Sequence, residues 1–188
     1  MRIYIEEVGK NSLDRVNKIL SGIERGAIKA VHNSLKRAGE TAKTQAARFA
    51  AEQYVISKGT FMSKVRITPK LTANSTGVTS MELRFTGGGI PLISFNVRYS
   101  RGGKLSAKVM RGGGGPIDSA FAARVFGPVG VFERIGKSRF PVEQKFGPST
   151  AHMMRNEDVL EKMEDTIVET YDKRLEQEIY RLLNGFGG

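Results

Sequence analysis

The chain has 188 residues, of which 39% are hydrophobic, with ten Phe and five Tyr but neither Trp nor Cys. This length predicts one domain, and the apolar fraction is sufficient for a core, which excludes two catalytic domains and a disordered tail. The absence of cysteine excludes disulfides, thiolate nucleophiles and cysteine-ligated metals. Because no apolar stretch has the length of a signal sequence or a membrane span, we expect neither secretion by that route nor a membrane protein.

The net charge of +11, from 30 Lys and Arg against 19 Asp and Glu, is unevenly distributed. Residues 157–188 hold nine acids and four bases, net -5, so the rest of the chain holds 26 bases and ten acids, net +16. A positive field of this size attracts nucleic acid or an acidic protein surface. An ordinary soluble basic surface is equally compatible with these counts.

The first elements in chain order are a short strand or extended lead-in over residues 2–8 and a long helix over residues 11–53. Asn11 can cap this helix, and apolar residues recur from Leu13 onward at steps of three and four. Gly22, Gly26 and Gly39 favour a bend. The second half of the helix is rich in Ala, which predicts close packing against a sheet or a neighbouring subunit.

The middle of the chain has the patterns of strands and turns. Ser57 starts a short helical turn over residues 57–63, and alternating apolar residues predict a mixed or antiparallel sheet of about four to six strands within residues 65–134. The strand candidates are residues 65–68, 79–86, 90–99, 104–110, 119–126 and 129–134. Glycine clusters at 87–89, 102–103 and 112–115 predict flexible hairpin loops between them. These loops carry Arg101, Lys104 and Arg111, which we expect to line a groove or channel and to face DNA if DNA is bound.

An acidic helix is predicted for residues 156–184. Asn156 can cap it, and Glu157 and Asp158 are favourable in its first turn because they lie at the positive end of the helix dipole. An apolar stripe runs from Val159 to Leu182. Two arrangements remain open: the acidic helix pairs with the basic helix of its own subunit, or it meets a basic face of the next copy.

The sequence offers no set of catalytic or metal-binding residues. The Gly136, Lys137, Ser138 run has a phosphate-loop ending, but five residues separate Gly130 from Gly136 where that motif has four. His32 and His152, the only histidines, have no second ligand at metal-binding spacing. We therefore expect a protein that is not an enzyme and has no metal or cofactor.

The least generic part of the chain, residues 121–153, carries a family resemblance together with three earlier blocks. The blocks, in chain order, are YVISKG (54–59), VRIT (65–68), IPLISF (90–95), GVFER (130–134), GKSRFPV (136–142) and GPS (147–149). They resemble the minor tail protein Z family of tailed bacteriophages and prophages over roughly residues 10–155. The resemblance implies a structural virion protein of the tail or neck, made in the host cytoplasm, that acts in tail assembly, tail completion or head-tail joining.

The same resemblance implies a sheet flanked by helices and assembly into a homo-oligomeric ring. It also implies contact with other phage tail, tail-terminator or connector proteins. The candidate subunit-interface residues are Arg134, Lys137, Arg139 and Lys145 on the basic side and Glu161, Asp165 and Glu169 on the acidic side. The alternative for the four basic residues is that they face DNA. The alternative function is a sequence-independent DNA-binding protein that contacts the DNA backbone through its basic body.

Overall fold

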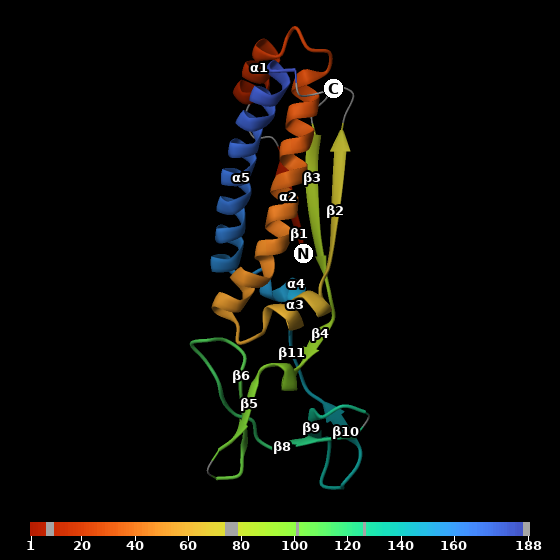
Figure 1. The fold of residues 1–188 in the computed structure, drawn as a ribbon. Helices are drawn as coiled ribbons and strands as arrows, with labels where there is room; N and C mark the ends of the chain where they lie inside the picture. The colour runs from red at the N-terminus through yellow and green to blue at the C-terminus, as the bar shows by residue number, and fades with distance from the viewer. Residues whose placement is uncertain (7–9, 74–78, 101, 126, 186–188) are drawn as a thin grey trace. The chain divides into compact units, whose positions relative to one another are not determined.

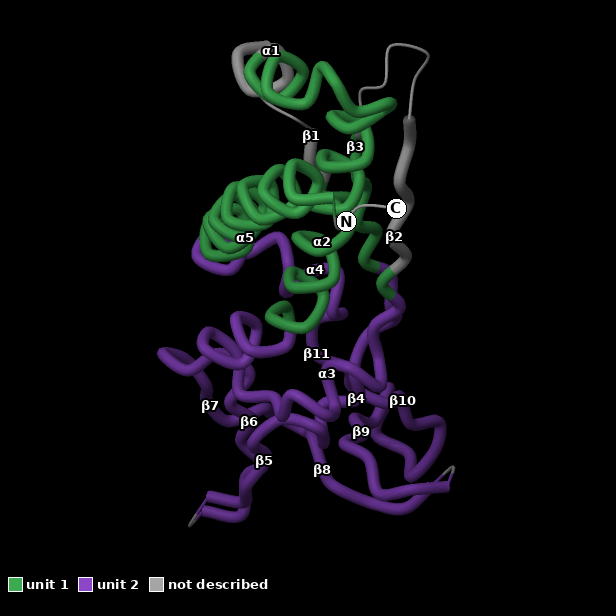
Figure 2. Tube along the Cα trace, turned by 45° about the horizontal axis from the view of Figure 1, so that its top comes forward, with its two compact units in different colours: residues 1–46, 67–85, 160–188 green, residues 47–66, 86–159 purple. Residues whose placement is uncertain are grey.

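The computed structural model describes residues 1–6, 10–73, 79–100, 102–125 and 127–185, and its fold is α+β, as the sequence predicts (Figure 1). The chain divides into two compact units, shown in separate colours in Figure 2. Unit 1 consists of Met1–Ala46, Ile67–Phe85 and Leu160–Gly188, and unit 2 of Ala47–Arg66 and Thr86–Val159. Each unit has its own antiparallel strands and its own buried residues.

Unit 1 combines helices with a three-stranded antiparallel sheet of strand order β1-β3-β2. Its strands are β1 (Arg2–Glu6), β2 (Arg66–Ala73) and β3 (Thr79–Thr86), and its helices are α1 (Lys10–Ile19) and most of α2 (Gly26–Gln53) and α5 (Glu157–Leu183). In β3, Met81, Leu83 and Phe85 are buried, which confirms the predicted alternation of that strand.

The helix predicted over residues 11–53 is interrupted between α1 and α2. Backbone hydrogen bonds from Ile23 N to Leu20 O and from Gly26 N to Ile23 O form tight turns there, and Arg25 adopts a φ of 54°. The apolar spacing continues through this break, because Leu20 and Ala27 are both buried. The bend favoured by Gly22 and Gly26 is therefore a complete break in the helix.

The Ala-rich stretch of α2 packs closely against the sheet of unit 1. Ala38 and Ala42 are fully buried, and a Cβ placed on Gly39 would collide with the sulfur of Met81 in β3. Small side chains on this face let the helix backbone approach the sheet, which confirms one of the two packing partners expected from the sequence.

Along α5, the predicted apolar stripe is buried at Val159, Met163, Ile167, Leu175, Ile179 and Leu182.

Unit 2 holds three small antiparallel sheets, two short α-helices and one 3-10 turn among its described residues. The sheets have strand orders β10-β9-β8, β11-β4 and β5-β6-β7. The strands are β4 (Gly89–Pro91), β5 (Asn96–Tyr99), β6 (Leu105–Lys108), β7 (Gly115–Pro116), β8 (Ala120–Ala123), β9 (Gly130–Arg134), β10 (Val142–Gln144) and β11 (Phe146–Ser149). The helical segments are α3 (Lys58–Lys64), η1 (Leu92–Ser94) and α4 (Thr150–Met153).

These strands differ from the predicted arrangement in two respects. The strands described in the chain form four sheets of two or three strands instead of one sheet of four to six. The stretch predicted as one strand over residues 90–99 is divided by η1 into β4 and β5, which belong to different sheets. The helical turn after Ser57 is confirmed as α3, with the Ser57 hydroxyl accepting a hydrogen bond from Thr60 N at 3.0 Å.

Candidate functional site

Two strongly exposed apolar side chains of unit 2 lie on the loop that joins β9 to β10. These strands pair in antiparallel register from Arg134 opposite Val142 to Phe132 opposite Gln144. Val131 and Phe132 are buried and anchor the hairpin, while all residues from 134 to 141 are exposed. Ile135 is 68% exposed and Phe140 57%. We call residues 134–141 the β9–β10 loop.

Arg134 and Arg139 belong to this loop but have different surroundings. Arg134 Nη1 donates to the carbonyl oxygen of Arg139 at 3.3 Å, and its guanidinium lies 5.3 Å from the ring centre of Phe121. Arg134 therefore holds the loop in shape. The guanidinium of Arg139 lies over the ring of Phe140 at 5.9 Å, and Lys137 is exposed. Within the described residues, neither Lys137 nor Arg139 forms an ion pair.

Lys145, the fourth basic candidate, is engaged by carboxylates of its own subunit. Its ammonium pairs with Glu133 on β9 and lies 3.5 Å from Glu143 on β10. The hydrogen bond with Glu133 raises the pKa of Lys145 above its usual value, with the charges of Glu133 and Glu143 acting in the same direction. Lys145 thus stabilises the hairpin, and the cations left for a partner are Lys137 and Arg139.

The acidic candidates form a stripe on α5. Glu161, Asp165 and Glu169 are exposed and lie four residues apart, so they share one face of the helix, which we call the acidic α5 stripe. Val168, 59% exposed, lies beside them on the helix. No ion pair to these three carboxylates is found in the described part of the chain.

The acids nearer the end of α5 are used inside unit 1 instead. Glu176 accepts a hydrogen bond from Arg15 at 2.9 Å, and Glu178 accepts one from Asn33 at 3.0 Å. Helix α5 therefore lies beside α1 and α2 through its C-terminal half (Figure 1). This pairing within the subunit is one of the two arrangements left open by the sequence, and it leaves the acidic α5 stripe unused.

The basic residues predicted to lie on DNA-facing loops are also held by their own chain. Lys104 forms an ion pair with Asp118 at 2.9 Å, and Arg111 Nε donates to the carbonyl oxygen of Ala51 at 2.9 Å. Arg101 lies outside the described residues. These contacts tie down the loops of unit 2, and the carboxylate of Asp118 offsets the charge of Lys104.

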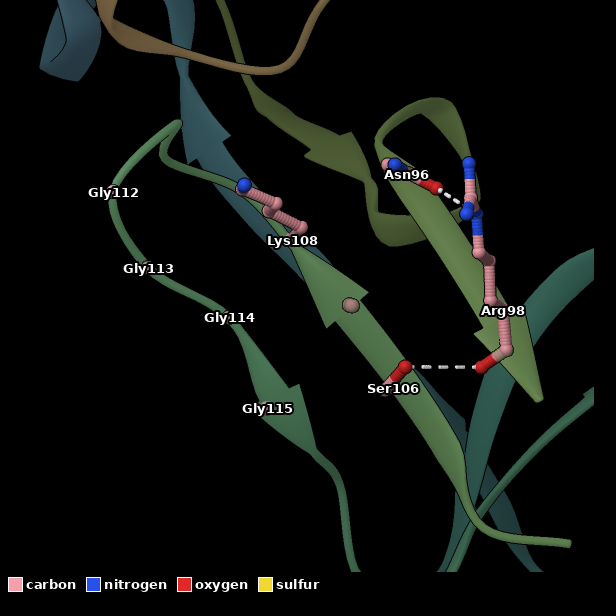
Figure 3. A pocket seen from close by; sticks show the side chains of 9 residues that line it. Asn96, Arg98, Ser106, Lys108, Gly112, Gly113, Gly114 and Gly115 are labelled. Carbon is pink, nitrogen blue, oxygen red and sulfur yellow. Dashed lines mark hydrogen bonds between the residues drawn. The ribbon is translucent and has the colours of Figure 1, made fainter. Parts of the chain in front are cut away.

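Two basic residues that sequence reasoning missed line a hollow on the β5-β6-β7 sheet (Figure 3). The hollow has a volume of about 500 Å³ and is lined by Asn96, Arg98, Ser106, Ala107, Lys108 and Gly112 to Gly115. We call it the glycine-loop hollow. The sequence did contain a signal for this polar face: two strand candidates each have polar residues two positions apart, at 96 and 98 and at 106 and 108.

The described residues contain no group of three His, Asp or Glu side chains placed to hold a metal ion. His32 and His152 are both exposed. None of the described helices is long and apolar enough to cross a membrane.

In comparisons with known proteins, the chain matches no family model, no curated protein and no solved structure.

Proposed function

We propose that this protein is a structural virion protein of a tailed bacteriophage that assembles with copies of itself in tail assembly, tail completion or head-tail joining. The observation that carries the proposal is the β9–β10 loop, which exposes Ile135 and Phe140 beside the unpaired cations Lys137 and Arg139. The blocks GVFER and GKSRFPV, which contribute to the family resemblance, cover β9, most of this loop and the start of β10.

Burial of the loop against a partner would supply the association free energy. Complete burial of a side chain the size of Ile or Phe contributes about 1.5–3 kcal/mol, and arginine and aromatic residues are enriched where binding energy concentrates. An exposed apolar group flanked by unpaired charges is thus typical of a contact surface.

The acidic α5 stripe is the complementary surface that we assign to the next copy. The three carboxylates of the stripe are opposite in charge to the two cations of the loop, and Val168 adds apolar area beside the carboxylates. Because the loop and the stripe are different patches, repetition of the contact is heterologous and generates a ring where the rotation closes. In the proposed assembly, tail-tube, tail-terminator or connector proteins contact the ring.

Charge reversal at Arg139 tests the assembly. We expect Arg139→Glu to raise the dissociation constant of the oligomer at least about tenfold, since it places like charges together in the interface. The substitution retains the backbone carbonyl that accepts the hydrogen bond of Arg134. Arg124→Glu is the matched control, because Arg124 is an exposed arginine outside the loop.

Sedimentation velocity and electron microscopy would provide the measurements. We expect ring-shaped particles of the wild type, dissociation in Arg139→Glu, and recovery when Asp165→Arg is added to Arg139→Glu. A wild type that stays monomeric at high concentration, or equal behaviour of Arg139→Glu and Arg124→Glu, would refute the assembly proposal. The phage assignment is tested separately by mass spectrometry of purified virions and by co-purification with tail proteins, and absence from virions would refute it.

A further inference from the structure

The outer face of the β5-β6 pair is polar and basic. The register places Asn96 opposite Lys108 and Arg98 opposite Ser106, so these four side chains project from one face of the antiparallel pair. Leu105 alternates with Ser106 along β6 and is buried on the other face. The sheet is therefore anchored on one side and presents two cations on the other (Figure 3).

The two cations are free to meet a ligand. Arg98 Nε donates to Asn96 Oδ1 at 3.0 Å, which directs the guanidinium back along β5 toward the register level of Lys108. Both residues are exposed, and no carboxylate lines the hollow. Among the residues that the structure describes, Arg98 and Lys108 form no ion pair. This contrasts with Lys104, which is neutralised by Asp118.

The glycine loop keeps the hollow open. Gly114 has a φ of +140°, and a Cβ at this position would lie 3.1 Å from the Ala107 carbonyl oxygen and from Lys108 Cα, so any other residue would be strained here. At Gly112, Gly113 and Gly115, a Cβ would meet nothing within 4 Å. Side chains at these three positions would project into free space, and their absence leaves bare backbone beside Lys108.

We infer that the glycine-loop hollow binds phosphate groups, in the form of the phosphodiester backbone of a nucleic acid. Arginine offers a planar set of donors that fits two phosphate oxygens, and lysine adds a compact positive charge. Contacts of this kind bind the backbone without reading the bases, so we expect no sequence preference. The site lies outside the β9–β10 loop and the acidic α5 stripe, and the inference therefore does not depend on the proposed assembly.

The test combines DNA binding with two double variants of equal net charge. The site variant is Arg98→Gln with Lys108→Gln, and its control is Lys58→Gln with Arg124→Gln, two other exposed basic residues of unit 2. Fluorescence anisotropy with labelled duplex DNA of random sequence would be measured across about 50–200 mM salt. Loss of two phosphate contacts makes the slope of log binding constant against log salt concentration less negative by about 1.8. At about 0.1 M salt this corresponds to roughly 60-fold weaker binding.

A third variant tests the hollow itself. Gly113→Glu adds a carboxylate to the loop that lines the hollow, at a position where a Cβ would meet nothing within 4 Å, so we expect weaker binding with unchanged thermal stability. A selective loss in the site variant and in Gly113→Glu, with the control unchanged, supports the inference. Equal losses in the site variant and the control, or no binding by the wild type at low salt, overturn it.

Free phosphate is the other source of the same ligand chemistry. Inorganic pyrophosphate is therefore titrated against the wild type and the site variant by calorimetry. Pyrophosphate binding that disappears in the site variant, without any DNA binding, overturns the assignment to nucleic acid. Sedimentation velocity of the site variant tests whether the substitutions also affect assembly. We expect the site variant to have the same oligomeric state as the wild type, so that a loss of DNA binding does not reflect a loss of assembly.

Discussion

Gly87 occupies a position in unit 2 where even one methyl group does not fit. A Cβ on Gly87 would lie 2.5 Å from Thr150 Oγ1 and 2.6 Å from the backbone carbonyl oxygen of Lys64. Cβ atoms essentially never approach other heavy atoms within 3.0 Å, so Gly87→Ala forces the chain to shift. The carbonyl of Lys64 belongs to the backbone and Thr150 is fully buried, so neither atom can rotate away freely. Overpacking of this kind lowers the free energy of unfolding by about 1–3 kcal/mol.

Thermal unfolding followed by circular dichroism measures this effect. A loss of about 2 kcal/mol lowers Tm by roughly 4–8 °C for a chain of this size. Gly88→Ala is the matched control, because a Cβ on the neighbouring glycine would meet nothing within 4 Å. We expect that control to be neutral or to stabilise by about 0.4–1 kcal/mol, since alanine restricts the unfolded chain.

A second substitution locates the origin of the strain. Thr150 Oγ1 is buried and has no hydrogen-bond partner among the described residues, so Thr150→Ala breaks no hydrogen bond. When Thr150→Ala is combined with Gly87→Ala, one of the two close contacts is removed, and we expect Tm to rise part of the way back to the wild-type value. If Gly87→Ala melts at the same temperature as Gly88→Ala, the close approach of Gly87 to Lys64 and Thr150 is refuted.

Two further predictions concern unit 2. Burial raises the pKa of Tyr54 above its usual value of 10.0, with the Asn156 side chain acting in the opposite direction. The unfolded chain therefore loses this proton first, so the contribution of Tyr54 to stability is complete below about pH 10 and falls as the pH rises toward the folded pKa. We expect urea midpoints measured from neutral to alkaline pH to fall less steeply for Tyr54→Phe than for the wild type, and parallel profiles would contradict this account. Ser57→Ala removes the oxygen that accepts from Thr60 N and should lower the free energy of unfolding by about 1 kcal/mol in urea titrations. Ser63→Ala at the other end of α3 tests whether the loss is specific to the cap.

Local sequence patterns predicted the elements whose burial follows a simple period. The apolar stripe of α5 and the alternation of β3 are both visible in the sequence, because each element buries one face along its whole length. Ser57 was recognisable as a cap, since its hydroxyl satisfies a backbone amide three residues away. These features depend on neighbours within a few residues.

Features set by distant partners were not predicted. Strand β10 has only three residues, and the four residues of β11 include a Gly and a Pro, so neither strand has much of a pattern of its own. β11 is a strand because it pairs with β4, whose Gly89 lies opposite Ser149. The division of the strands into four sheets likewise depends on which segments meet, and the alternation of residues within a strand carries no information about its partner.

The candidate interface shows the same limit for function. Counting charges placed Arg134, Lys137, Arg139 and Lys145 in one class, yet the structure uses Arg134 and Lys145 within the subunit. The charge of Lys145 is already paired with Glu133 and Glu143, so its field is largely cancelled nearby, and the guanidinium of Arg134 is engaged in holding the loop. Lys137 and Arg139 are therefore the positions where a substitution should affect association with the least effect on folding.

The glycine clusters show most clearly why composition alone does not determine a role. The sequence predicted hairpin loops for residues 87–89 and 112–115 alike, because each cluster follows a strand pattern. At Gly87 the missing side chain allows close packing, and any Cβ would meet Lys64 and Thr150. At Gly112, Gly113 and Gly115 there is free space, so close packing does not explain three glycines there. These three glycines leave backbone accessible beside the unpaired cation of Lys108. The cluster at residues 112–115 therefore supports a binding role, whereas the cluster at residues 87–89 does not.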